Sequence, residues 1–187
     1  MARATTPSRS PGRPRSSVDA AVFAATLSTV HELGYTRATV DRIAAEAGVA
    51  KTTIYRRWPS KGALITACLV DAFGPLPLKE GASRAEVMET AIRYGAARIT
   101  EPGIAAAFAG VFTDAIGDPA LREILSTQLQ DPYRLVLQEA LGESEQRVLF
   151  FVDVVIGTLL HRMGMTGEPM AAADVDALVT MIQRELT

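Results

Sequence analysis

Apolar residues recur at intervals of three and four along almost the whole of this chain, which is the spacing of one face of an α-helix. Runs of alternating β-branched residues bounded by turns, which would indicate strands, are missing from it. We therefore predict an all-α protein of about nine helices. The helices are expected over residues 18–33, 40–47, 51–58, from 61 through at least 69, and over 84–100, 104–116, 119–141 (where 131–132 is a candidate kink), 143–163 and 172–186.

Glycine and proline divide this helical pattern into parts. Gly34 and Gly48 end the first two helices, and the sequence Gly-Pro-Leu-Pro at 74–77 is a hard break. Residues 1–16 are rich in Pro, Ser, Arg and Gly without periodicity, which is typical of a disordered arm. The predicted organisation is an arm over 1–16, a helical module over 17–67 and a larger helical domain over 68–187.

Charge is divided unevenly between these parts. Residues 1–67 contain ten Lys and Arg against four Asp and Glu, a net charge of +6. Residues 68–187 contain nine against seventeen, a net charge of −8. A basic N-terminal part followed by an acidic larger domain indicates that the N-terminal part binds a polyanion. On charge alone, chance segregation of solvated side chains stays open as the alternative.

The most informative segment is TVDRIAAEAGVAKTTIYRRWPSKGAL, residues 39–64. Thr39 is a good N-cap for a short helix with one apolar stripe. Residues 48–50, Gly-Val-Ala, then lead into a second short helix. Two short helices joined in this way predict a helix-turn-helix, whose second helix enters the major groove of DNA. The stripe on the first helix consists of Val40, Ile43, Ala44 and Ala47.

The second short helix has one apolar and one polar side. Ile54 and Trp58, four residues apart, share its inward face. Arginine can bind guanine bidentately, and threonine can offer its hydroxyl or its methyl group to a base, so the polar side suits groove reading. That polar side consists of Thr52, Thr53 and Arg56. The two residues that flank the inward face and are expected to reach phosphates are Tyr55 and Arg57.

Two predicted helices begin with a lysine. Lys51 follows Ala50, a poor cap, and Lys61 follows Ser60. A cation in the first turn opposes the helix dipole by ~0.3–1 kcal/mol, whereas a bound phosphate would favour it. We therefore predict that both helix starts lie on a phosphate backbone. The alternative is a plain helical mini-domain with surface Lys and Arg.

Residues 17–67 resemble the DNA-binding domain of the tetracycline-repressor-like (TetR) transcriptional regulators. The resemblance is carried by five short segments, namely Ile43-Ala44, Ala47-Gly48-Val49, Thr53-Ile54-Tyr55, Trp58 and Lys61-Gly62-Ala63-Leu64. The resemblance implies that phosphates are held by Thr39, Tyr55 and Lys61. It also implies that bases or adjacent phosphates are approached by Arg42, Lys51, Thr52 and Thr53. The chain departs from the family at Ala50, where serine is frequent, at Thr52, where glycine is common, and at Gly62, where an acid is common.

The resemblance further implies that residues 68–187 form a helical ligand-binding and dimerisation domain. The last two predicted helices are strongly apolar and suit a two-fold contact between subunits, or else they form the core of one subunit. The residues that we assign to the dimer interface are Phe151, Val155, Leu159, Val175, Leu178, Val179 and Ile182. Asp153, amid apolar neighbours, either caps an interhelical bond, faces a ligand or lies exposed.

Aromatic residues in the middle of the larger domain are candidates for an apolar effector pocket. We assign Phe108, Phe112 and Tyr133 to it, although such residues are often simply core. His161 follows an apolar run and is assigned to the same pocket, with a buried histidine as the alternative. Likewise, Arg13 and Arg15 of the arm either follow the minor groove or belong to a solubilising tail.

Other classes of protein have little support in the sequence. One cysteine and two distant histidines do not form a metal site, and neither a Gly-rich phosphate loop nor a nucleophile–base set is present, so we predict no cofactor, no metal and no catalytic residue. The longest apolar run, 149–160, is shorter than the ~18 residues of a membrane span. No secretory signal is evident, so we expect a cytoplasmic protein with no membrane partner.

We therefore interpret the chain as a ligand-responsive transcriptional regulator, a repressor that binds a palindromic operator in double-stranded DNA as a homodimer. Its effector would be an unidentified small molecule. One alternative is a helical enzyme whose basic segment binds a polyphosphate. Another is a helical protein-interaction or ligand-binding module without operator-specific DNA binding.

Overall fold

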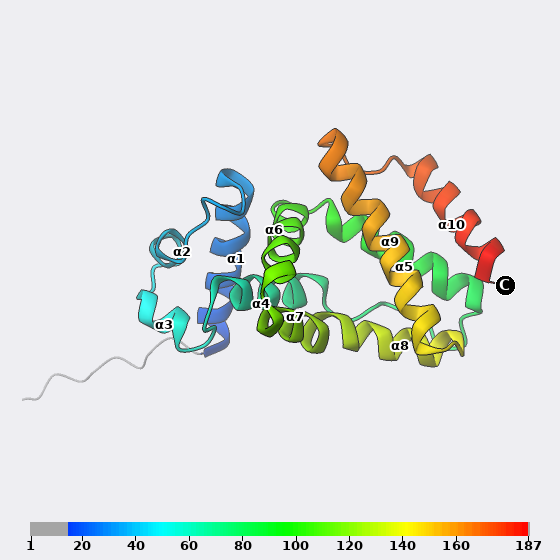
Figure 1. Cartoon of the computed structure of the whole chain (residues 1–187), viewed down its shortest axis with the longest axis horizontal. Coiled ribbons are helices and arrows are strands. Elements are labelled where there is room, and N and C mark those ends of the chain that lie inside the picture. Colours follow the sequence, from blue (N-terminus) through cyan, green and yellow to red (C-terminus); the bar gives the residue numbers. More distant parts are fainter. Residues whose placement is uncertain (1–14, 187) are drawn as a thin grey trace, which may run out of the picture.

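The computed structural model describes residues 15–186, and every regular element in that range is a helix (Figure 1). Residues 1–14 of the predicted arm, and with them the assignment of Arg13, lie outside the described residues, whereas residues 15 and 16 belong to the first helix instead of the arm. In chain order the elements are α1 (Arg15–Leu33), α2 (Val40–Glu46), α3 (Lys51–Tyr55), α4 (Lys61–Phe73), α5 (Arg84–Ile99), α6 (Ile104–Gly117), α7 (Pro119–Leu125), the π-helical segment η1 (Ser126–Gln130), α8 (Asp131–Leu141), α9 (Glu145–Thr166) and α10 (Ala172–Leu186). Because α7, η1 and α8 follow one another without a break, the described residues form nine helical segments, as predicted.

The first three helices and α4 enclose a small core at one end of the molecule (Figure 1). Val22 of α1, Ile43 of α2 and Ile54 of α3 are buried in it. The side-chain oxygen of Thr39 accepts a hydrogen bond from the first turn of α2, and Gly48 ends that helix with a φ of 64°. The predicted helix-turn-helix is therefore confirmed.

Helix α4 links this small core to the rest of the molecule. Leu64 and Cys68 are buried in the small core. Ile65, Leu69 and Phe73, on another side of the same helix, are buried in the large core of the C-terminal domain. A boundary drawn at residue 67 falls inside this shared helix, so the two parts are joined by a rigid element.

Helix α5 lies at the centre of the C-terminal domain, where it packs against α8, α9 and α10. It begins with a capping box. The Ser83 side chain accepts a hydrogen bond from the Glu86 N–H, and the Glu86 carboxylate accepts one from the Ser83 N–H at 2.8 Å. The Ser83 hydroxyl also donates a hydrogen bond to this carboxylate at 2.7 Å. The bonds from the Ser83 hydroxyl and N–H hold the pKa of Glu86 below its ordinary value, because they favour the carboxylate.

The helix predicted over 119–141 is interrupted by one π-helical turn. Asp118 caps its start, since one carboxylate oxygen accepts the N–H groups of Ala120 and Leu121 at 3.0 and 3.1 Å. Further along, Pro132 has no N–H and its ring meets the carbonyl four residues earlier, so the regular α-helical pattern cannot continue through it. The wider η1 turn lies directly before α8, next to the position of the predicted kink.

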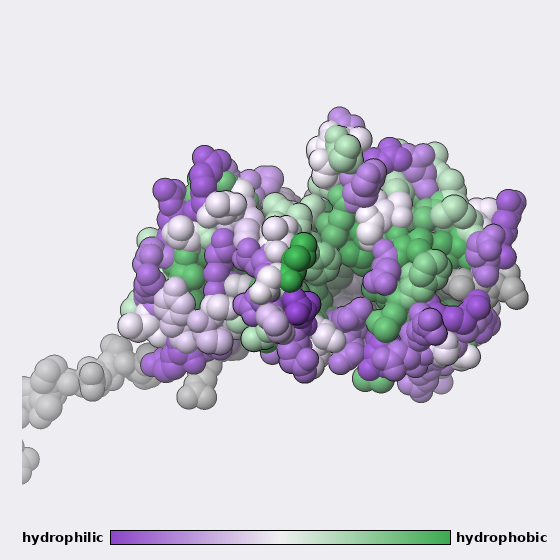
Figure 2. Space-filling model, in the orientation of Figure 1, coloured by the Kyte–Doolittle hydropathy of each residue, from purple (hydrophilic) through white to green (hydrophobic). Residues whose placement is uncertain are grey.

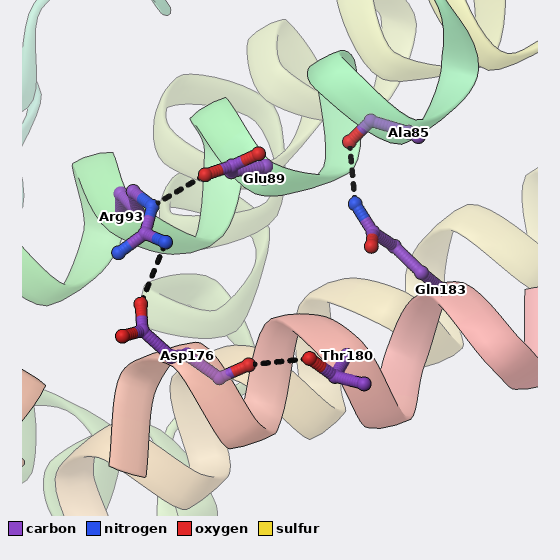
Figure 3. Close-up of polar contacts among 6 residues, drawn as sticks. All are labelled: Ala85, Glu89, Arg93, Asp176, Thr180 and Gln183. Atoms are coloured by element: carbon purple, nitrogen blue, oxygen red, sulfur yellow. Dashed lines mark hydrogen bonds and ion pairs between the residues drawn. The ribbon is translucent and has the colours of Figure 1, made fainter. Parts of the chain in front are cut away.

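Helix α10 lies along α5 and is held there by polar as well as apolar contacts (Figure 3). Arg93 of α5 pairs with Glu89 at 2.8 Å and with Asp176 of α10 at 2.7 Å. One turn from the other end of α10, the Gln183 amide donates a hydrogen bond to the carbonyl oxygen of Ala85 at 2.9 Å. Both ends of α10 are therefore attached to this chain's own α5.

This packing shows that the predicted dimer interface is wrong in its residues. All seven side chains are at most 6% exposed in the single chain. They belong to the large core of their own chain, so almost none of their surface is available to a partner. The apolar stripes of α9 and α10 attach these helices to their own domain, and a stripe of this kind looks the same in the sequence whichever surface it covers. The seven residues are Phe151, Val155, Leu159, Val175, Leu178, Val179 and Ile182.

Within residues 15–186, α9 is the one helix long and apolar enough to cross a membrane by length and composition. Core helices of soluble proteins pass the same test. One face of α9, which includes Val148 and Val155, is buried in the large core.

Candidate nucleic-acid interface and ligand cavity

Helix α3 is seated on the small core by its inward face. Ile54 is 1% exposed. The Trp58 ring, just beyond the helix, packs against Phe23 of α1 with their centroids 5.3 Å apart. The helix ends at Tyr55, three residues earlier than predicted, and the chain continues as a turn. As expected, Ala50 gives its first turn no side-chain cap.

Most of the predicted DNA-contacting residues lie exposed around α2 and α3. Thr52 and Arg56 point away from the core on the side opposite Ile54, as the helical spacing requires. Thr53 is half-buried between the two sides. We call the exposed set the α2–α3 face, and it consists of Thr39, Arg42, Lys51, Thr52, Tyr55 and Arg56.

Lys51 has a partner within this face. Its ammonium group lies 2.8 Å from a carboxylate oxygen of Asp41 on α2 and 5.7 Å from the centroid of the Tyr55 ring. The hydrogen bond to Asp41 raises the pKa of Lys51. The sequence of either short helix alone does not reveal Asp41 as this partner, because the turn between α2 and α3 brings the two helix starts together.

Two predicted phosphate contacts are turned inward, which corrects their assignment. Arg57 pairs with Asp19 of α1 and lies over the Trp58 ring, 5.9 Å from its centroid. Lys61 is half-buried, and its ammonium group donates to the Tyr35 carbonyl oxygen at 2.8 Å while lying 3.8 Å from the centroid of that tyrosine's ring. Burial lowers the pKa of Lys61. Both cations therefore have partners within the module, and neither belongs to the exposed α2–α3 face.

Tyr35 also connects the N-terminal module to α6. Its hydroxyl group donates a hydrogen bond to a carboxylate oxygen of Asp114. Its ring covers Gly110 so closely that a Cβ atom there would lie 1.9 Å from the ring. Burial and the nearby Asp114 carboxylate raise the pKa of Tyr35. At the start of α6, Gly103 lies against Leu27 of α1, where a Cβ would be 2.4 Å from the Leu27 carbonyl oxygen. At Gly103 and Gly110 the N-terminal module therefore packs directly against the backbone of the α6 segment.

A cavity of about 650 Å³ lies within the C-terminal domain, between α5, α6, α7–α8 and α9. In the space-filling view the surface is hollowed between α6 and α9, with hydrophobic residues on the walls (Figure 2). Phe108, Phe112 and Tyr133 line it, as expected of them. His161 is exposed outside this lining, which corrects its assignment. Lining residues that sequence analysis did not single out for the pocket include Phe73, Tyr94, Arg122 and Gln130.

Helix α6 has the cavity on one side and the N-terminal module on the other. Phe108 and Phe112, one turn apart, line the cavity. Gly110 and Asp114, also one turn apart, contact Tyr35. Two residues correspond to roughly 200° of rotation about the helix axis, so these pairs lie on nearly opposite faces. The residues that line the cavity and those that contact Tyr35 therefore lie on the same helix.

Two models of one protein family match this chain. Residues 22–68 match the model described as bacterial regulatory proteins, tetR family. Residues 85–187 match the model described as tetracyclin repressor-like, C-terminal domain. The two matches coincide with the helix-turn-helix module and with the domain that holds the cavity.

Individual relatives agree with these matches. The chain is 30% identical over 179 residues to an uncharacterized HTH-type transcriptional regulator of Mycobacterium tuberculosis, covering 91% of this chain and 86% of the relative. It is 31% identical over 170 residues to the DNA-binding transcriptional repressor TetR of Mycobacteroides abscessus, covering 86% and 88%. The crystal structure of a transcriptional regulator from Pseudomonas aeruginosa PAO1 shares the fold, with a TM-score of 0.68 at 18% identity over 94% of this chain and 92% of that one. The chain thus belongs to the tetR family of bacterial regulatory proteins, and is a transcriptional regulator with an N-terminal DNA-binding domain and a C-terminal ligand-binding domain.

Proposed function

We propose that this regulator is a repressor that binds a palindromic operator as a dimer and leaves it when a small molecule occupies the cavity. A two-fold dimer offers two copies of α3 to two half-sites, about one helical turn of DNA or a multiple of it apart. The relative from Mycobacteroides abscessus is named a repressor, which supports repression as the outcome. We further propose that the protein acts in the cytoplasm and has no enzymatic role, in keeping with relatives named as regulators.

The observation that carries this proposal is the division of α3 into two faces. Ile54 is buried, whereas Thr52 and Arg56 are exposed together and free to approach base edges. The ion pair of Lys51 and Asp41 is itself exposed, and exposed pairs are weak because water and salt screen them. A DNA phosphate can therefore replace Asp41 as the partner of Lys51.

We assign the dimer contact to the outward faces of α9 and α10. These faces carry large apolar side chains that the chain's own core does not cover, namely Phe150 at 64%, Met165 at 74% and Met181 at 53% exposure. Figure 2 shows hydrophobic residues gathered over this end of the molecule. Exposed apolar surface of this kind is typical of an interaction site. A two-fold contact of the same helices from two subunits would be isologous.

We assign the coupling between cavity and DNA to α6. A ligand that displaces Phe108 or Phe112 moves the helix whose other face carries the contacts with Tyr35. Tyr35 precedes α2 and accepts a hydrogen bond from Lys61 at the start of α4. Displacement of Tyr35 would therefore change the orientation of the α2–α3 face. A coupling free energy of ~1–3 kcal/mol would change operator affinity about 5- to 150-fold.

Gel-shift titrations of the purified protein against genomic fragments, at one fixed salt concentration, test the proposal. The wild type should give a discrete complex, and Arg56→Ala should lose discrimination at one base pair, by ~1–3 kcal/mol. Lys79→Ala is the matched control, because it removes an exposed positive charge outside the α2–α3 face. A wild type that forms no discrete complex, or an Arg56→Ala variant that binds like Lys79→Ala, would contradict the proposal.

A further inference from the structure

One side of α9 is left uncovered by the rest of the chain. Buried residues such as Val155 and Leu159 attach the opposite side of this helix to the large core. With about 100° of rotation per residue, the residues within roughly 40° of Gly157 point away from that core, and all of them are exposed. We call this set the α9 outer face, and it consists of Gln146, Phe150, Asp153, Gly157, His161 and Gly164.

The order of residues along the α9 outer face is symmetric about Gly157. Asp153 lies four residues before Gly157, and His161 lies four residues after it. Phe150 and Gly164 lie seven residues before and seven after. In a two-fold contact between antiparallel helices, a residue before the crossing point lies at the level of the partner residue that is equally far after it. A crossing at Gly157 would therefore place Asp153 level with the partner's His161, and Phe150 level with the partner's Gly164.

Asp153 and His161 are the ionisable residues of the α9 outer face. Within residues 15–186, neither side chain has a hydrogen bond or an ion pair. The arginines of α9 are engaged elsewhere, because Arg147 and Arg162 each pair with a carboxylate of their own chain at 3.0 Å. An imidazole ring can donate an N–H hydrogen bond to a carboxylate whether the ring is neutral or charged. The single chain therefore presents an acceptor and a donor, each without a partner, at matching distances from Gly157.

We propose that the α9 outer face binds the same face of a second copy of this chain, with the two helices antiparallel and crossing at Gly157. Each His161 donates a hydrogen bond to the partner's Asp153, so the contact contains two identical pairs. Phe150 packs on helix backbone at the partner's Gly164, and the absence of a side chain at Gly157 lets the helices approach closely. This inference rests on the proposed function, because it gives the register of the dimer contact assigned there to α9 and α10.

A second copy is the occupant that this symmetry favours. A two-fold contact needs a surface that is complementary to itself, and the α9 outer face has an acidic and a basic residue exchanged by one axis. Complementary charges across a contact also fix its register. Phe150, at 64% exposure, supplies apolar surface beside each charged pair.

Disulfide cross-linking of the full-length protein, without DNA, tests the register. Gly157→Cys would place two thiols beside the two-fold axis, where the Cα atoms can come within the ~4.4–6.8 Å of a disulfide. Gly164→Cys is the matched control, because its two copies would lie on opposite sides of the crossing, about 21 Å apart. A Cβ at either glycine has nothing within 4 Å, so both variants should fold. The native Cys68 is buried and should not cross-link.

After mild oxidation, Gly157→Cys should run mainly as a covalent dimer on a non-reducing gel, and Gly164→Cys should run as a monomer. Absence of cross-linking in Gly157→Cys, or equally efficient cross-linking of Gly164→Cys, would overturn the register.

A charge exchange tests the pairs themselves, with the dissociation constant of the dimer measured by sedimentation equilibrium. His161→Asp would oppose two carboxylates at each pair and should weaken the dimer roughly 10-fold or more. Adding Asp153→Lys to this variant restores opposite charges and should return the dissociation constant to within about 3-fold of the wild type. Gln128→Glu, which adds an exposed negative charge outside α9, should have no effect. A double variant as weak as His161→Asp, or a His161→Asp variant that behaves like Gln128→Glu, would overturn the pairing.

This inference and the proposed function can fail separately. A wild type that sediments as a dimer while Gly157→Cys does not cross-link would overturn the register and leave the dimeric regulator intact. A wild type that stays a monomer at every concentration would contradict the dimer contact and the register together. The gel shift tests the DNA-binding assignment independently of both.

Discussion

Replacing Gly110 by alanine should disturb the contact between the two domains. A Cβ at this position would lie 1.9 Å from Cγ of Tyr35 and 2.2 and 2.4 Å from the two Cδ atoms of the ring. Real atoms do not approach so closely, so either α6 or the ring must move. If the ring turns away, its hydroxyl leaves Asp114 and the Lys61 ammonium group loses its contact with the ring.

The expected loss of stability in Gly110→Ala is measured relative to a matched control, Gly164→Ala. Gly164 of α9 is also helical, but its Cβ would have nothing within 4 Å. Alanine in place of a helical glycine gains ~0.5–1 kcal/mol at either site, and overpacking costs ~1–3 kcal/mol at Gly110 alone. The free energy of unfolding of Gly110→Ala should therefore be about 1–3 kcal/mol below that of Gly164→Ala.

Urea denaturation followed by circular dichroism and by fluorescence of Trp58, the single tryptophan, measures this difference. In the double variant Tyr35→Ala/Gly110→Ala the added methyl group no longer meets a ring, so its cost should largely disappear. Equal stabilities of Gly110→Ala and Gly164→Ala would refute the close contact. The same result would remove the basis for coupling through this face of α6.

Lys51→Ala should lower the slope of log affinity for DNA against log salt concentration by about one unit in filter-binding titrations. Lys61→Ala should leave that slope unchanged and lower the free energy of unfolding, because the Lys61 side chain contacts Tyr35. A changed slope would instead show that Lys61 binds a phosphate. Ser83→Ala should destabilise the protein by ~0.5–2 kcal/mol in urea denaturation, through loss of the capping box, and an unchanged midpoint would argue against the cap. Burial raises the pKa of the Cys68 thiol to about 12, so at pH 8 an aromatic disulfide reagent should label it only on unfolding, whereas rapid labelling of the native protein would show that it is not buried.

Features that depend on neighbours in the sequence could be predicted. The caps Thr39, Ser60, Ser83 and Asp118 each bond to the first turn of their own helix, so the starts of four helices follow from local chemistry alone. The two sides of α3 follow from helical rotation in the same way. These local rules were sufficient for the fold class and for most of the α2–α3 face.

Features that depend on residues distant in the sequence could not be predicted from it. The sequence marks Arg57 and Lys61 as basic residues near a reading helix, but not that Asp19 and Tyr35, from other parts of the module, hold them. Likewise, apolar residues on α9 and α10 were expected at a dimer contact, although α5 of the same chain covers them. The exposed residues of these helices, such as Phe150, were the better candidates, and only the packing separates the two sets.

The most direct test of the central claim, that α3 reads base edges through its exposed side, is guanine methylation interference on a bound operator fragment. Arginine binds guanine through O6 and N7, so methylation of N7 blocks that contact. For the wild type, methylation should interfere in two symmetric half-sites, and Arg56→Ala should become insensitive at one guanine in each. An identical interference pattern for the wild type and Arg56→Ala, or a single asymmetric region of interference, would contradict the account.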